Sequence, residues 1–190
     1  MKPHVRILGI DDSPFKFKDK HALVVGALVR VPDYLESVMR TEVAVDGTDA
    51  TEKLVELVLR SRYKDQIKAI MLDGIAVAGF NVVDIEKLCT STGVPVVTVT
   101  RDRPDFDKMR EALTTYFDDW RKRFEIITRL ELRKVQTEHK PVYVCSCGGD
   151  HRELDALVRL STVRGAIPEP IRMAHLIASA MVRGESYGSS

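Results

Sequence analysis

The sequence has 190 residues, of which 44% are hydrophobic and 30% are charged. This composition is that of a globular protein, and it excludes a disordered chain, a collagen-like repeat and a small disulfide scaffold. The 29 lysine and arginine residues balance 28 aspartate and glutamate residues, so the formal net charge of +1 indicates no class of partner. We expect one domain over residues 1–190, whose function depends on where particular residues lie.

No segment reaches the roughly 18 consecutive apolar residues of a membrane span, and charged residues from Lys2 to Asp12 leave no room for a signal peptide. The three cysteines, Cys89, Cys145 and Cys147, form no disulfide framework. One Cys-x-Cys pair is also too few for a zinc site, so buried thiols are expected. We therefore expect a cytoplasmic protein without membrane contact, and nothing indicates an obligate protein partner.

The first 45 residues predict three strands. Apolar runs over residues 5–10, 22–31 and 34–45 are separated by short turns that cannot hold a helical crossover, which favours an antiparallel meander. The first run ends at the acidic pair Asp11 and Asp12.

The pattern then changes to alternating helices and strands. The expected elements are a helix over 50–62 with a capping box at Asp49 and Glu52, a strand over 67–72, a helix capped by Asn81 and ending at Gly93, a strand over 95–100 and a helix over 104–120. This alternation indicates parallel strands joined by right-handed crossovers. The aromatic stripe from Phe106 to Trp120 is expected to pack against the sheet.

The remaining elements are expected as strands over 126–133 and 142–145, a helix opened by a capping box at Asp150 and Glu153, a last helix from about Pro170 to Arg183, and a flexible tail over 184–190. Three antiparallel strands followed by alternating helices and strands is the element order of the ribonuclease H-like architecture: a mixed α/β sheet with helices on both faces. Other mixed α/β layouts share this order.

Asp11 and Asp73 each end an apolar strand. If these strands are neighbours, both carboxylates emerge at one edge of the sheet. Carboxylate oxygens suit Mg²⁺ or Mn²⁺, and Gly74 allows the backbone to approach closely. The alternative is that each aspartate only forms a turn or caps a helix.

Glu52 is a natural third acid, because its helix leads directly into the Asp73 strand. It could instead only cap that helix, and Asp12, Asp46 and Asp49 are rivals for the same role.

His175 shares one stripe of the last helix with Arg172, Ser179 and Arg183. A lone histidine on a polar stripe is usually just solvated, so the pattern alone gives it no chemical role.

Five features together resemble endonuclease V, and more closely the archaeal branch described as an endonuclease acting at deoxyuridine. They are the segment 8–11, the 21-residue separation of Glu52 from Asp73, the segment 72–74, the strand 93–101, and the segment 167–175, which is very similar to the family's Pro-Glu-Pro-x-Arg-x-Ala-His/Asp motif. The chain departs from the family pattern at Arg101, where a lysine is expected, and at residues 75–78. The strand-separating Pro-Tyr-Ile-Pro segment has no counterpart in residues 40–51.

The resemblance implies a metal-dependent endonuclease that cuts DNA near a deaminated base, uracil or hypoxanthine, after displacing that base into a pocket. It implies that Asp11, Glu52 and Asp73 hold Mg²⁺ or Mn²⁺. His175 would orient or deprotonate the attacking water, and the expected contacts to phosphate come from Arg101, Arg103 and Arg172. Two alternatives remain: a non-catalytic module that binds nucleic acid or a nucleotide, and a nuclease selective for hybrids or junctions.

Overall fold

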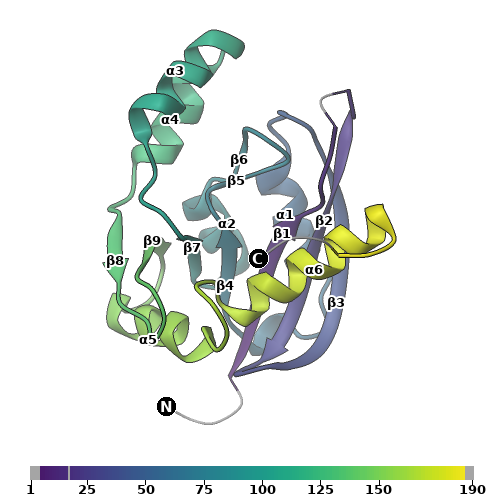
Figure 1. The fold of residues 1–190 in the computed structure, drawn as a ribbon, viewed down its shortest axis with the longest axis vertical. Coiled ribbons are helices and arrows are strands. Elements are labelled where there is room, and N and C mark those ends of the chain that lie inside the picture. Colours follow the sequence, from purple (N-terminus) through teal and green to yellow (C-terminus); the bar gives the residue numbers. More distant parts are fainter. Residues whose placement is uncertain (1–4, 17, 187–190) are drawn as a thin grey trace.

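A seven-stranded mixed sheet, in the order β3-β2-β1-β4-β7-β9-β8, organises the molecule (Figure 1). The computed structural model describes residues 5–16 and 18–186. The sheet contains β1 (Arg6–Asp12), β2 (His21–Arg30), β3 (Tyr34–Ala44), β4 (Ile67–Asp73), β7 (Val96–Thr100), β8 (Arg133–Val135) and β9 (Val142–Cys147), and a separate hairpin contains β5 (Ala76–Val77) and β6 (Asn81–Val82). The helices are α1 (Ala50–Leu59), α2 (Ile85–Thr92), α3 (Phe106–Tyr116), α4 (Trp120–Thr128), α5 (His151–Ser161) and α6 (Glu169–Arg183), and a short 3-10 helix (Lys64–Gln66) precedes β4.

The strand pairing confirms the predicted change of pattern. β1, β2 and β3 form an antiparallel meander. β4 pairs in parallel with both β1 and β7, as the helical crossovers predict. β9 then pairs antiparallel with both β7 and β8. The single-domain organisation of residues 1–190 stays a prediction.

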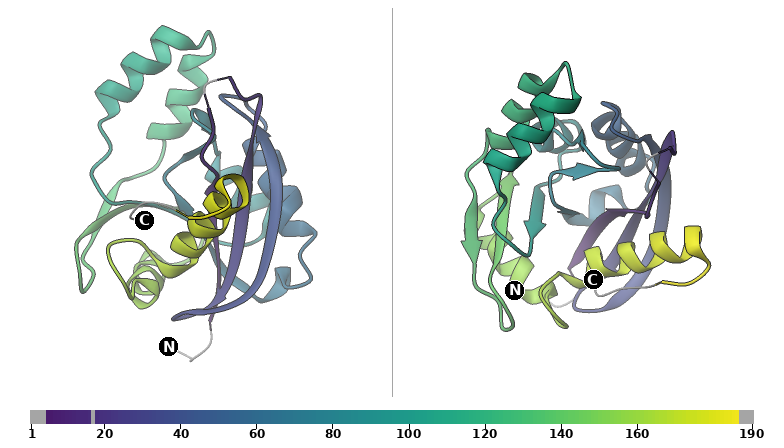
Figure 2. Two further views of the ribbon diagram at one scale, coloured as in Figure 1. Left: turned by 45° about the vertical axis from the view of Figure 1, so that its right-hand side comes forward. Right: turned by 45° about the horizontal axis from the view of Figure 1, so that its top comes forward.

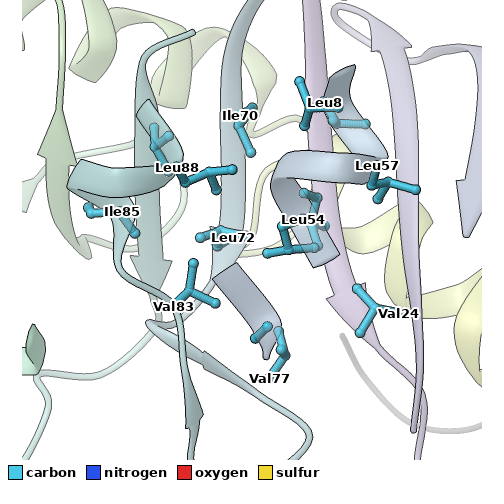
Figure 3. Close-up of a cluster of buried hydrophobic side chains, with 14 of the residues drawn as sticks. Leu8, Val24, Leu54, Leu57, Ile70, Leu72, Val77, Val83, Ile85 and Leu88 are labelled. Atoms are coloured by element: carbon cyan, nitrogen blue, oxygen red, sulfur yellow. The ribbon is translucent and has the colours of Figure 1, made fainter. Parts of the chain in front are cut away.

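Helices cover both faces of the sheet, as expected. On one face α1 and α2 bury an aliphatic cluster that includes Leu8, Leu54 and Leu72 (Figure 3). On the other face α5 and α6 cover Ile7 and Met71. Side chains alternate between the two faces of a strand, so neighbouring residues of β1 and β4 serve different layers. This alternation also decides the direction of the acidic side chains at the strand ends.

Gly9 in β1 fixes how closely α6 lies on the sheet. A Cβ atom at this position would lie 2.0 Å from the carbonyl carbon of Pro170 and 2.4 Å from the amide nitrogen of Ile171. Both of these atoms are backbone in the first turn of α6, which cannot give way as a flexible side chain can. The absence of a side chain at Gly9 therefore seats α6 directly on β1.

Gly9→Ala should lower the free energy of unfolding by about 3 kcal/mol, because the methyl group must push the α6 backbone off β1. Urea unfolding measures the change, and Ala27→Gly, at a buried position of β2, controls for a change of one methyl group in the sheet. A loss below about 1 kcal/mol for Gly9→Ala would contradict the close seating of α6.

The predicted N-terminal capping interactions of α1 and α2 are wrong. Asp84, not Asn81, caps α2, and its carboxylate accepts from the Lys87 amide. The side chain of Asn81 instead accepts from the Ala50 amide and donates to the Asp49 carboxylate. Because Asp49 is held in this way, it makes no capping bond to α1, and the predicted capping box does not form.

The predicted helix over 104–120 is two helices, and the strand predicted to begin at 126 is wrong. The chain turns after Tyr116, and α4 continues to Thr128. Aromatic side chains of α3 and α4 pack with the β5–β6 hairpin in a cluster of their own and not on the main sheet. Figure 2 shows α3 and α4 projecting from the rest of the fold.

The buried guanidinium of Arg123 ties this projection to the core. It donates to the backbone carbonyls of Asp46, Gly47 and Phe80, and it lies 4.2 Å from the centre of the Phe117 ring.

Cys145 is buried, as expected for a thiol outside any disulfide, whereas Cys89 and Cys147 are only partly buried. At the C-terminus, α6 ends at Arg183 and Gly184 caps it, and residues 187–190 of the expected tail lie outside the described part of the chain. None of the helices in the described part combines the length and the apolar character that crossing a membrane requires.

Candidate active site

Asp11 and Asp73 lie at the same edge of the sheet. β1 and β4 are parallel, and Ile10 pairs with Leu72, so the two aspartates are level at the ends of adjacent strands. Because side chains alternate along a strand, Asp11 lies on the same face as Gly9, and Asp73 on the same face as Met71, which is the face that α5 and α6 cover. Asp11 is only 5% exposed. The structure therefore brings together the two acids that the sequence singled out.

His175 on α6 completes this group. Its Nδ1 atom lies 2.8 Å from Oδ2 of Asp11, at the point where α6 is seated over β1. The pKa of Asp11 is raised to about 6, first by burial and then by the charges of Asp73 and Asp12, while the hydrogen bond from His175 opposes the rise. The same hydrogen bond raises the pKa of His175. The polar stripe of the helix could not predict the role of His175, because its partner Asp11 is 164 residues away in the sequence.

Asp12 is the third acid of the group. Its side chain points to the opposite face from Asp11 and accepts from the Ala78 amide at 2.7 Å. Burial raises the pKa of Asp12, and its charge raises the pKa of both Asp11 and Asp73. We call Asp11, Asp12, Asp73 and His175 the acidic cluster. The sequence signal for Asp12 was its place beside Asp11 at the end of a strand.

The structure does not bring Glu52 to the acidic cluster. Thr51 and Leu54 of α1 are buried, whereas Glu52 is exposed on the side that faces α2. There its carboxylate pairs with Lys87, and this bond lowers the pKa of Glu52. The number of residues between Glu52 and Asp73 matches the family. However, Glu52 lies on the face of α1 that is turned towards Lys87 of α2, and not towards the acidic cluster.

The other two rivals hold the backbone in place. Asp46 accepts from the Phe80 amide at 2.8 Å, and Asp49 accepts from the Ala44 amide at 3.1 Å. Both carboxylates therefore fix the β5–β6 hairpin and the end of β3.

The three arginines expected at phosphate have different surroundings. Arg101 follows β7, and its charge opposes the rise that burial causes in the pKa of Asp73. Arg103 is exposed and lines the same pocket as Arg101. Arg172 instead forms a two-pronged ion pair with the buried carboxylate of Glu169, at 2.9 and 2.6 Å. The guanidinium of Arg172 is thus committed to neutralising Glu169, which the motif did not reveal.

A pocket of about 550 Å³ borders Asp73. Its walls come from the segment after β4, the end of β7, α3 and α4. Phe80 and Phe106 supply aromatic surface, and Thr98 and Thr100 supply hydroxyl groups. The pocket could hold a planar polar group beside the acidic cluster.

The cluster fits a hard divalent cation through its donor chemistry. In the described part of the chain, no three His, Cys, Asp or Glu side chains stand close enough to cage an ion. Mg²⁺ does not require such a cage, because it keeps several waters and often binds one or two carboxylates together with substrate phosphates. The negative charges of Asp73 and Asp12 raise the pKa of Asp11, and a cation between these side chains would relieve that repulsion.

A family model described as endonuclease dU matches residues 3–182. The chain belongs to the endonuclease dU family. Among similar proteins, a UPF0215 protein of Methanosarcina barkeri is 42% identical over 191 residues, covering 100% of this chain and 97% of that protein. A UPF0215 protein of Methanothermobacter thermautotrophicus is 43% identical over 192 residues, covering 100% of this chain and 94% of that protein.

Solved structures confirm the predicted ribonuclease H-like fold of this endonuclease dU family member. A protein of unknown function from Archaeoglobus fulgidus has a TM-score of 0.84 at 37% identity and covers 94% of this chain and 99% of its own. Human endonuclease V has a TM-score of 0.63 at 16% identity and covers 95% and 85%. Ciona intestinalis endonuclease V, solved with a 24mer DNA containing an inosine followed by a ribo-adenosine, has a TM-score of 0.60 at 17% identity and covers 90% and 83%. The family match supports a nuclease, and the endonuclease V structures show the fold.

Proposed function

We propose that this protein is a Mg²⁺- or Mn²⁺-dependent endonuclease that hydrolyses a phosphodiester in DNA near a deaminated base, uracil or hypoxanthine. The observation that carries the proposal is the convergence of Asp11, Asp12 and Asp73 with His175 beside a pocket. Membership of the endonuclease dU family and the DNA bound to Ciona endonuclease V support the substrate class.

In this proposal Asp11 and Asp73 would hold the divalent ion, and Asp12 would take the third place that the sequence assigned to Glu52. A bound ion would supply positive charge to stabilise the attacked phosphate. The protein contributes the buried carboxylate of Asp11 and the partly buried carboxylates of Asp12 and Asp73, whose mutual repulsion a cation would relieve.

His175 acts on the attacking water. Its Nδ1 atom is held by Asp11, which fixes the orientation of the ring and leaves Nε2 to bind the water. Because Asp11 raises the pKa of His175, the ring accepts a proton readily and can serve as a general base. Arg101 binds the phosphate through its guanidinium, beside Asp73.

The pocket next to Asp73 receives the displaced base. Phe80 and Phe106 would stack on its ring, and Thr98 and Thr100 would read its edge by hydrogen bonds. Arg103, at the rim of the pocket, is placed to contact the flanking phosphate.

A set of labelled duplexes tests the proposed function. Duplexes with deoxyuridine, deoxyinosine or neither are incubated with the protein in Mg²⁺, in Mn²⁺ or in a chelator, beside Asp73→Ala. We expect cleavage only of a damaged duplex and only with metal. Cleavage of undamaged hybrids or junctions would favour a structure-selective nuclease. Binding without cleavage under every metal would favour a non-catalytic module.

A further inference from the structure

The loop between β1 and β2 leaves the sheet at the edge that carries the acidic cluster. It follows Asp12 directly, and Phe15 is three residues farther on, so the two Cα atoms are at most about 11 Å apart. Figures 1 and 2 show this turn at the same end of the molecule as the β5–β6 hairpin. We use "β1–β2 loop" for residues 13–16 and 18–20.

The β1–β2 loop concentrates positive charge. Lys16, Lys18 and Lys20 are exposed, and none of them forms an ion pair with another residue in the described part of the chain. The loop has one acid, Asp19, whose carboxylate accepts from the Lys16 amide at 2.7 Å. In a chain with a net charge of only +1, this is a local excess of basic groups next to the acidic cluster.

The loop also presents the aromatic ring of Phe15, and hydrogen bonds to β2 hold the start of the loop in place. Ser13 is buried, its amide donates to the Leu23 carbonyl at 2.7 Å, and its Oγ accepts from the Leu23 amide at 3.2 Å. Two residues later Phe15 is 37% exposed, so part of its ring is accessible from solvent beside the lysines. Exposed aromatic rings flanked by cations are typical of surfaces that bind unstacked bases.

We propose that the β1–β2 loop grips DNA: Lys16, Lys18 and Lys20 contact the phosphates beside the cleaved one, and Phe15 stacks on a base next to the displaced one. The inference rests on the proposed function, since it takes DNA as the ligand. Its geometric basis is that a reach of about 11 Å from Asp12 spans only a few nucleotide steps.

Salt-dependent binding tests the lysines. Binding of a fluorescent deoxyuridine duplex is measured in Ca²⁺ at several salt concentrations, with a gel to check that the duplex stays intact. Lys16→Ala/Lys18→Ala should lower the slope of log K against log salt by about 2, whereas Lys134→Ala/Lys140→Ala, two exposed lysines near β8 and β9, should leave it unchanged. Equal slopes for the two double variants would overturn the inference.

A fluorescent base tests Phe15. A duplex with 2-aminopurine beside deoxyuridine should brighten on binding wild-type protein. With Phe15→Ala the affinity should fall roughly tenfold and the rise in fluorescence should be altered, while Phe15→Trp should retain the affinity. An unchanged affinity and fluorescence for Phe15→Ala would overturn the stacking role.

The same measurements separate the two proposals. If wild-type protein binds and cuts the duplex but the loop variants behave like wild type, the loop inference fails and the proposed function stands. If wild-type protein binds no DNA duplex at all, the proposed function fails, and the loop inference with it.

Discussion

Asp73→Asn should lower the rate of cleavage at least about a thousandfold. The substitution keeps the shape of the side chain but removes a charged ligand that the proposed metal centre requires. Burial raises the pKa of Asp73, which means that the ionised carboxylate destabilises the folded state. The variant should therefore also be more stable than wild type in a chelator at pH 8. A gain in stability with a loss of activity separates this result from simple unfolding. The two readouts are single-turnover cleavage and urea unfolding.

Glu52→Gln is the matched comparison. Glu52 is half-exposed and pairs with Lys87, so its loss should change the cleavage rate by less than about threefold. Asp12→Asn, in contrast, should behave like Asp73→Asn in cleavage. If Glu52→Gln abolished cleavage and Asp12→Asn did not, the assignment of the third acid would be reversed.

The second large effect is a pH-dependent stabilisation by metal. In a chelator, the free energy of unfolding should fall as the pH rises from about 4 to about 7. The folded pKa of Asp11, about 6, lies above its usual value of 3.8, so the folded state holds the proton more tightly and loses that advantage as the proton leaves. A shift of this size corresponds to about 3 kcal/mol. The raised pKa of His175 adds to the fall, since its contribution is present below pH 6.5 and lost above.

Mg²⁺ should reverse this fall, because it binds the ionised carboxylates. At a concentration of about 100 times its Kd it should add about 2.7 kcal/mol at pH 8, and much less at pH 5, where protons compete. Chemical unfolding with and without Mg²⁺ at the two pH values measures the difference. In Asp73→Asn the Mg²⁺ effect should be nearly lost. An effect of equal size at both pH values, or in both proteins, would show that the ion binds elsewhere.

The sequence was sufficient to predict the two acids that end buried strands, because an apolar run and the residue that ends it are local features. The apolar runs before Asp11 and Asp73 predicted two buried strands, and the parallel pairing of β1 with β4 brings their ends level. The motif that contains His175 marked a residue whose partner lies 164 positions away. That pairing depends on the seating of α6 over Gly9, which no local pattern contains.

The sequence was insufficient where two local roles compete. Asp49 and Glu52 match a capping box, but Asp49 bonds to Asn81 and Glu52 bonds to Lys87 on another helix. The periodicity after Phe106 could not show a turn between α3 and α4, because tertiary packing around the buried Arg123 guanidinium stabilises that turn. In each case a contact distant in the chain outweighs the local preference.

The most direct measurement of the central claim is the position of Mn²⁺ in crystals. Crystals of the wild-type protein, grown with Mn²⁺ and a deoxyuridine duplex, would be examined by anomalous scattering at the manganese edge. We expect a peak in contact with the carboxylates of Asp11 and Asp73, on the side of His175, with the DNA phosphate beside it. A peak beside Glu52 and none at the acidic cluster would contradict it.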